Sequence, residues 1–201
     1  LDRGWMPVPV PFRTKRPVIS EWQHFAISDD DLPTHFNNTS QNVGVLLGTA
    51  SNGLVDIDLD CAQAIHLADL FLPATEGVFG RKSKPRSHRL YVVTESVGAV
   101  CRFCDVVKDA SGKQPALVEY RSTGGQTIFP GSVHEAGEPI EWENDQPYHV
   151  DDGAMLLRSV KRLASASLLA RHWPGSGSRH DARLALTGGL IRAGWNEADT
   201  A

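Results

Sequence analysis

Residues 54–60 read Leu54-Val55-Asp56-Ile57-Asp58-Leu59-Asp60, with apolar and acidic side chains in strict alternation. Because successive side chains of a β-strand point to opposite faces, this pattern predicts a strand with one apolar face and three carboxylates on the other. Carboxylates about 7 Å apart on one strand face repel one another and lose hydration when half-buried. Such a cluster is tolerated most easily when a divalent cation lies among the carboxylates.

The acidic face is typical of a two-metal site for phosphoryl chemistry. Magnesium and manganese prefer hard oxygen ligands and leave coordination positions free for substrate phosphates. Two other interpretations stay open at this point. Asp60, with Gln63 three residues later, could cap the helix that follows. Asp58 could instead face solvent on an edge strand.

Two further residues are candidates for the same site. Glu119 lies in a second alternating stretch, where it shares a face with Leu117 and Arg121. A third carboxylate from a neighbouring strand would complete the metal site; the alternative is an exposed glutamate paired with a cation across the strand. His88 opens an expected strand and could donate a hydrogen bond to a phosphate; the alternative is a partly exposed histidine at a strand end.

Periodicity, capping signals and turn residues predict the other elements. Helices are expected from Ser28 through Phe36, from Cys61 to about Leu72, over Met155–Arg171 and from Ser178 to Ala193, with a further one capped by Asn196. Strands are expected at Val43–Leu47, Leu90–Val93, Ala116–Arg121 and Gln126–Phe129, and Pro73–Ser87 is expected to be a long basic loop. This order predicts a mixed α/β core followed by a helical tail.

Composition and charge restrict the classes of protein that fit. Hydrophobic residues make up 41% and no apolar run approaches the roughly 20 residues of a membrane helix, so we expect no membrane partner. Three sparse cysteines favour a reducing cytoplasm, and the lone pair Cys101 and Cys104 lacks the further ligands of a zinc site.

The net charge of −4 is unfavourable for nucleic-acid binding, but the charge is segregated. Residues 77–89 and 156–180 contain basic residues and no acidic ones, whereas residues 135–152 contain seven acids and no Lys or Arg. Because a polyanion responds to the local field, the basic segments are candidate contacts for DNA; the alternative is a solvated face.

As an ordered set, the motifs resemble the bifunctional primase-polymerase domain of the archaeo-eukaryotic primase superfamily over about residues 4–150. The segments that carry the resemblance are Lys15-Arg16-Pro17 with Trp22, residues 43–48, residues 53–60, residues 80–91, Val118–Arg121 with Gly124-Gly125, and Pro130-Gly131-Ser132-Val133-His134. The resemblance implies an α+β fold: a mostly antiparallel sheet with an RRM-like primase catalytic core flanked by helices. It implies a catalytic domain over residues 1–152 and, over residues 153–201, the start of a helical module.

The resemblance also implies roles for individual residues. The family's D-x-D metal motif corresponds to Asp58 and Asp60, although a register shift would give Asp56 with Asp58. Its active-site histidine corresponds to His88, and its third acid to Glu119. The remaining expected contacts are with nucleotide (Arg81, His88, Arg89, Arg121, Ser132 and His134) and with DNA (Lys15, Arg158, Lys161 and Arg162). Arg86 stands where the family's S-x-H motif usually has serine.

The expected activity is template-directed nucleotidyl transfer from NTPs or dNTPs on single-stranded DNA, with Mg²⁺ or Mn²⁺, in the replication of a mobile element. The basic segment that ends at His88 suits a triphosphate better than a water nucleophile. Because the sequence begins with Leu1 and ends within a helical pattern, we expect part of a longer protein, in which a helicase domain could follow. The alternatives are a catalytically silent single-stranded-DNA-binding replication module and a metal-dependent nuclease or end-processing enzyme.

Overall fold

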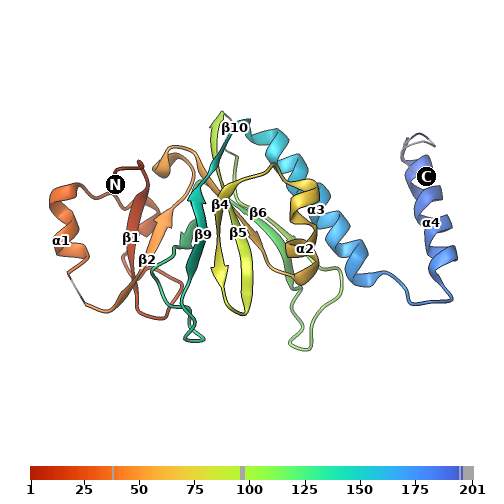
Figure 1. Ribbon diagram of the computed structural model, residues 1–201, viewed down its shortest axis with the longest axis horizontal. Helices are drawn as coiled ribbons and strands as arrows, with labels where there is room; N and C mark the ends of the chain where they lie inside the picture. The colour runs from red at the N-terminus through yellow and green to blue at the C-terminus, as the bar shows by residue number, and fades with distance from the viewer. Residues whose placement is uncertain (38, 96–97, 195, 197–201) are drawn as a thin grey trace.

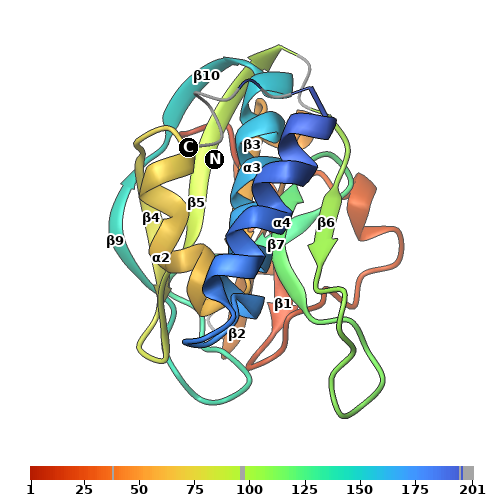
Figure 2. The ribbon, with the colours of Figure 1, turned by 90° about the vertical axis from the view of Figure 1, so that its right-hand side faces the viewer.

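The computed structural model describes residues 1–37, 39–95, 98–194 and 196, which form two sheets and a layer of helices. Figure 1 shows these layers side by side: the smaller sheet, the larger sheet, and then the helices, with α4 outermost. Figure 2, seen from the helical side, shows α2, α3 and α4 in front of the larger sheet. This mixed α+β architecture with mostly antiparallel strands confirms the predicted fold class.

The larger sheet has the strand order β6-β7-β3-β5-β4-β9, and β10 pairs with β5. Its strands are β3 (Leu54–Leu59), β4 (Glu76–Arg81), β5 (Lys84–Glu95), β6 (Cys101–Cys104), β7 (Ala116–Arg121), β9 (Glu141–Gln146) and β10 (Tyr148–Asp152). The central strand β3 is antiparallel to both of its neighbours, β5 and β7, and β10 pairs in parallel with β5. The acidic stretch therefore lies in the middle of a sheet.

The smaller sheet consists of β1 (Met6–Pro11), β2 (Gln41–Leu46) and β8 (Gln126–Ile128), all antiparallel. Prolines at every second position of β1 are tolerated because β1 is an edge strand, where the missing N–H groups face away from the ladder. The residues between them, Val8 and Val10, are buried. The 3₁₀ turns Trp22–His24, Asp29–Asp31 and Thr49–Ser51 and the short helix α1 (Leu32–His35) complete this end of the molecule.

The hydrophobic core lies on both sides of the larger sheet. On one side, the apolar face of β3 packs against α2 (Ala62–Phe71) and α3 (Gly153–His172), with Leu156, Val160 and Leu163 of α3 fully buried. On the other side, toward the smaller sheet, Phe79, Leu90 and Phe129 form a second cluster. The carboxylate face of β3 is on this second side.

The predicted helices are largely confirmed. A capping box between Ser28 and Asp31 opens the first one, and α2 and α3 lie close to their predicted bounds. The last, α4 (Arg179–Arg192), is followed by Gly194 at a φ of 91°, and none of its described side chains is buried. The helix predicted after Asn196 lies outside the described residues. No described helix is long and apolar enough to cross a membrane.

The prediction of a long loop over residues 73–87 is wrong, because β4 and the start of β5 form a β-hairpin there. Gly77 and Gly80 resemble loop residues in the sequence, but they are needed for close approach. A Cβ on Gly77 would lie 2.8 Å from Pro147 Cα, and one on Gly80 would lie 2.6 Å from the Lys84 carbonyl oxygen. Strands β9 and β10 in the acidic segment were also not predicted. The hairpin brings Lys84 to the carboxylate face.

A candidate metal and nucleotide site

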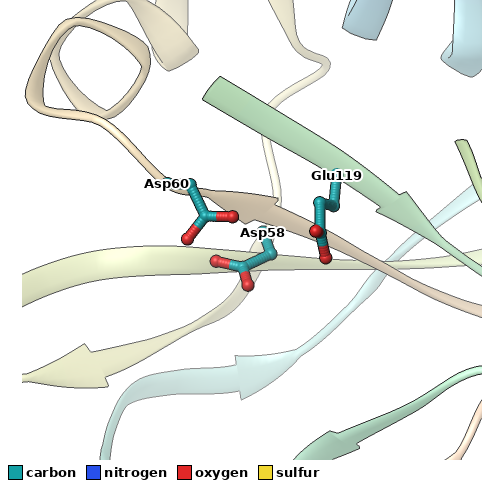
Figure 3. A group of neighbouring side chains, drawn as sticks. All are labelled: Asp58, Asp60 and Glu119. Atoms are coloured by element: carbon teal, nitrogen blue, oxygen red, sulfur yellow. The ribbon is translucent and has the colours of Figure 1, made fainter. Parts of the chain in front are cut away.

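Three carboxylates converge on the inner face of the larger sheet. In the strand register, Asp58 of β3 lies directly opposite Glu119 of β7 on one side and His88 of β5 on the other. Asp60 follows the end of β3. Oxygens of Asp58, Asp60 and Glu119 all lie within 4.8 Å of one another, and Figure 3 shows the three carboxylates turned toward one region. The group is the arrangement predicted for a metal site.

Three cations among the described residues pair with these carboxylates, and one of them is Arg102, whose Nε lies 2.9 Å from Glu119 Oε1. Lys84 Nζ lies 2.8 Å from Asp60 Oδ1 and 3.4 Å from Asp58 Oδ1. The Arg121 guanidinium pairs with Asp58 Oδ2 and, at 2.8 Å, with Glu119 Oε2. Burial alone would raise the pKa of Asp58, but the charges of His88, Arg121 and Lys84 outweigh it and lower this pKa to about 2. Asp58 is therefore ionised at neutral pH. Lys84 was not predicted to belong to the site.

His88 is held by a different acid, Asp56. Its Nδ1 lies 2.9 Å from Asp56 Oδ2, and its ring stacks on Phe79 at 4.4 Å between centroids with 5° between the planes. Burial would lower the pKa of His88, but the carboxylates of Asp56 and Asp58 raise it. Asp56 is not in the group of candidate metal ligands found among the described residues, and its assignment as a metal ligand stays a prediction.

A pocket of about 300 Å³ opens over Asp58 and Asp60, between the two sheets, and Glu119 is not among its lining residues. Its walls combine Asp58, His88 and Arg121 of the larger sheet with Asn42 and Thr127 of the smaller one. Of the residues predicted from the sequence, those that line it are Asp58, Asp60, Arg81, His88, Arg121, His134 and Lys15. Nearby Lys84 and Ser87 line it as well. The pocket thus places acidic and basic groups around one volume, as phosphate chemistry requires.

Several predicted contacts are not brought to this pocket. Arg89 follows His88 on β5, points to the helical side of the sheet and pairs with Asp69 of α2 at 2.9 Å, a placement at odds with a role in gripping nucleotide. Ser132 is buried, and its hydroxyl accepts a hydrogen bond from the Val43 N–H. Three predicted DNA contacts lie on the exposed side of α3, across the sheet from the carboxylates: Arg158, Lys161 and Arg162.

His134 lines the pocket next to Lys15 and Arg81. Burial lowers its pKa, and the two neighbouring cations lower it further. At neutral pH its ring is therefore a neutral hydrogen-bonding group rather than a cation. Its Nδ1 accepts a hydrogen bond from the Ala136 N–H at 3.1 Å, which leaves Nε2 as the ring nitrogen available to a ligand.

The structure excludes both structural interpretations of the aspartates. The residue that caps α2 is Cys61, whose sulfur accepts a hydrogen bond from the Ala64 N–H at 3.4 Å, and not Asp60. Asp58 is only 4% exposed and lies on the central strand, not on an edge. Cys101 and Cys104 are free cysteines and belong to no metal-ligating group of the described residues.

An oxygen-rich cluster beside a basic pocket on an antiparallel sheet is typical of metal-dependent phosphoryl- and nucleotidyl-transfer enzymes. The family model of the bifunctional DNA primase/polymerase, N-terminal, matches residues 1–163, and the chain belongs to this family. The family match supports nucleotidyl transfer of the primase/polymerase type, with DNA and nucleotides as substrates. No curated protein matches the sequence. Because the match ends inside α3, the predicted domain boundary after residue 152 stays a prediction.

Proposed function

We propose that this chain is a DNA-directed primase/polymerase that transfers nucleotides from NTPs or dNTPs to a 3′-hydroxyl on a single-stranded DNA template. The observation that carries the proposal is the convergence of Asp58, Asp60 and Glu119 within 4.8 Å, with Asp58 and Asp60 lining a pocket that has basic walls. A carboxylate cluster alone is common on protein surfaces. One that is largely buried and faces several cations suits a triphosphate with its metal ions.

The donor set fits Mg²⁺ or Mn²⁺. It consists of carboxylate oxygens only, without sulfur or imidazole ligands that would favour zinc. The ammonium group of Lys84, which contacts both Asp58 and Asp60, occupies a position that suits positive charge. When bound, the metal would lower the pKa of the attacking hydroxyl and neutralise charge on the pyrophosphate that leaves.

The protein's own residues would hold and orient the substrate. Arg121 contacts both Asp58 and Glu119, so it fixes the two carboxylates relative to each other. Lys84 and His88 lie beside these acids on the pocket wall, where each can donate a hydrogen bond to a phosphate oxygen. Arg81 and His134 lie on the same wall. These groups restrict the triphosphate to one orientation, which is the main contribution of the protein in phosphoryl transfer.

The template would pass the mouth of the pocket. Lys15 lines the pocket and is half exposed, so it can contact a backbone phosphate near the site. The basic residues of α3 face away from the pocket, and we propose them only as contacts for DNA remote from the reacting nucleotide. Replication of a mobile element, and a helicase domain after the helical module that begins at residue 153, are parts of the proposal that rest on the resemblance alone.

Primer extension tests the proposal. Wild-type protein is incubated with a labelled primer, a single-stranded template, nucleotides and Mg²⁺ or Mn²⁺, alongside Asp58→Ala and a control, Asp151→Ala, on the exposed strand β10. We expect extension by the wild type and the control and none by Asp58→Ala. Extension by Asp58→Ala at the wild-type rate would refute the site. DNA binding without incorporation would indicate the silent module, and degradation without nucleotides would indicate the nuclease.

A further inference from the structure

Asp56 is a buried acid that the proposed reaction does not use. Its side chain is 0% exposed, it does not line the pocket, and it lies outside the group formed by Asp58, Asp60 and Glu119. Burying a carboxylate is costly unless charge and hydrogen bonds compensate for the lost hydration. A carboxylate at such a position therefore needs hydrogen-bonding or charged partners that compensate for its lost hydration.

Its partner is the imidazole ring of His88. Asp56 Oδ2 and Oδ1 lie 2.9 and 3.2 Å from Nδ1, so both oxygens face the same nitrogen. The nearest Arg121 nitrogen is 4.0 Å from Oδ2, beyond hydrogen-bonding distance. An ionised carboxylate can only accept, so the proton of this hydrogen bond belongs to Nδ1. The Asp56 carboxylate is thus directed at one histidine nitrogen.

This hydrogen bond leaves Nε2 for the pocket. Nε2 lies 3.9 Å from Asp58 Oδ1, too far for a hydrogen bond. The ring stacks on Phe79 with 5° between the planes, which restricts its tilt, and the bond to Asp56 distinguishes the two ring edges. His88 is 17% exposed and lines the pocket, so its free edge is accessible to a ligand. Asp56 and Phe79 together determine the position of Nε2.

We propose that Asp56 is a positioning residue, whose carboxylate accepts the Nδ1–H of His88 and so turns Nε2 toward the phosphates of the nucleotide, without binding metal. This inference rests on the proposed function of the pocket. Strand geometry explains why Asp56 differs from the other two aspartates. Asp56, Asp58 and Asp60 share one face of β3, but Asp56 is farthest from the strand end where Glu119 and Asp60 meet. It faces the histidine instead.

The variant Asp56→Asn tests the inference, because asparagine keeps the shape and removes the charge. We expect kcat/KM for the nucleotide to fall about 10- to 100-fold, the effect of losing an orienting partner behind an active group. The affinity for Mn²⁺ without nucleotide, measured by paramagnetic resonance, should stay within about twofold of the wild type. In ¹⁵N spectra of protein labelled at histidine, the His88 ring should carry a proton on Nδ1 in the wild type. In the variant the protonation of the two ring nitrogens should differ from this.

Two further variants separate positioning from general damage. In a His88→Gln background, Asp56→Asn should cause little further loss, since the group that it positions is absent. Asp105→Asn is the matched control: Asp105 is also buried, and its Oδ1 lies 2.7 Å from His172 Nε2, but the pair is remote from the pocket. It should leave kcat/KM unchanged.

Loss of Mn²⁺ affinity in Asp56→Asn, or equal losses of activity with and without His88, would overturn the inference. If the wild type extends no primer, the proposed function fails, but the inference is still tested. The ¹⁵N spectrum and the binding of a nucleoside triphosphate then decide: unchanged His88 protonation and unchanged affinity in Asp56→Asn would refute it.

Discussion

The two faces of β3 share one backbone and differ in chemistry. Val55, Ile57 and Leu59 are fully buried against α2 and α3, where each contributes about 1.5–3 kcal/mol to folding. Asp56 and Asp58 are equally buried on the other face but cost free energy, which their cationic partners must offset. The comparison shows that this strand supports stability on one face and carries the candidate site on the other.

The largest expected effect is on the acidic face. Asp58→Asn should lower the rate of primer extension by at least about 10²–10³-fold, the size found when a charge-stabilising group is removed from an active site. The fold should be retained, because Arg121 keeps Glu119 and Lys84 keeps Asp60 as partners. Steady-state kinetics and a thermal melt measure the two effects; a variant that fails to fold would show that the faces are not separable.

On the apolar face, Ile57→Ala should lower the stability of the fold and leave the rate of extension nearly unchanged. The free energy of unfolding should fall by about 2–5 kcal/mol, because a fully buried side chain leaves a cavity between β3 and the helices. The rate of extension per folded molecule should change less than threefold. Urea unfolding and kinetics corrected for the folded fraction are the measurements, and a tenfold loss of rate in the folded protein would contradict the comparison.

Divalent metal should distinguish the faces in a binding experiment without DNA. Because Mn²⁺ binds the folded state, a concentration 100 times its Kd should stabilise the wild type by about 2.7 kcal/mol. Ile57→Ala should keep this increment, although it starts from a lower stability. Glu119→Gln should lose most of it. Thermal unfolding with and without Mn²⁺ measures the increment. The full increment in Glu119→Gln would show that Glu119 does not bind the metal.

The smallest expected effects are opposite responses to pH. His88, on the pocket side, has a raised pKa, so its stabilising effect is present below pH about 6.5 and is lost as the pH rises through the folded value. Asp105, which anchors the end of α3, has a lowered pKa, chiefly through the hydrogen bond from the Val107 N–H. Its effect is present above pH about 3.9 and is lost on acidification.

Urea unfolding over a range of pH measures both responses. The difference in stability between wild type and His88→Gln should shrink at alkaline pH, and that between wild type and Asp105→Asn should shrink at acid pH. The same direction of change for both variants would contradict the assigned partners.

The alternation of β3 was readable from the sequence because its period of two is local. The sequence also predicted α2 and α3, whose apolar stripes pack on that strand. The hairpin of β4 and β5 was not predicted, since the glycines that permit its close packing have the same appearance as loop residues. Arg89 was assigned to the nucleotide from the resemblance and from its place beside the basic segment, without regard to the strand face. In a strand, His88 and its neighbour Arg89 must point to opposite faces.

The roles within the site depended on register, which no local pattern specifies. Asp58 lies opposite both His88 and Glu119 only because three strands align across the sheet. The sequence therefore identified the acids but not that Asp56 pairs with the histidine. Lys84 was within the predicted basic segment, but its contact with Asp60 requires the hairpin to fold over the end of β3.

Anomalous diffraction from a crystal soaked with Mn²⁺ and a non-hydrolysable nucleoside triphosphate tests the central claim most directly. The expected result is manganese density bounded by oxygens of Asp58, Asp60 and Glu119, with the triphosphate in the adjoining pocket and His88 Nε2 facing a phosphate oxygen. Manganese bound at other residues, with the nucleotide outside this pocket, would contradict the account.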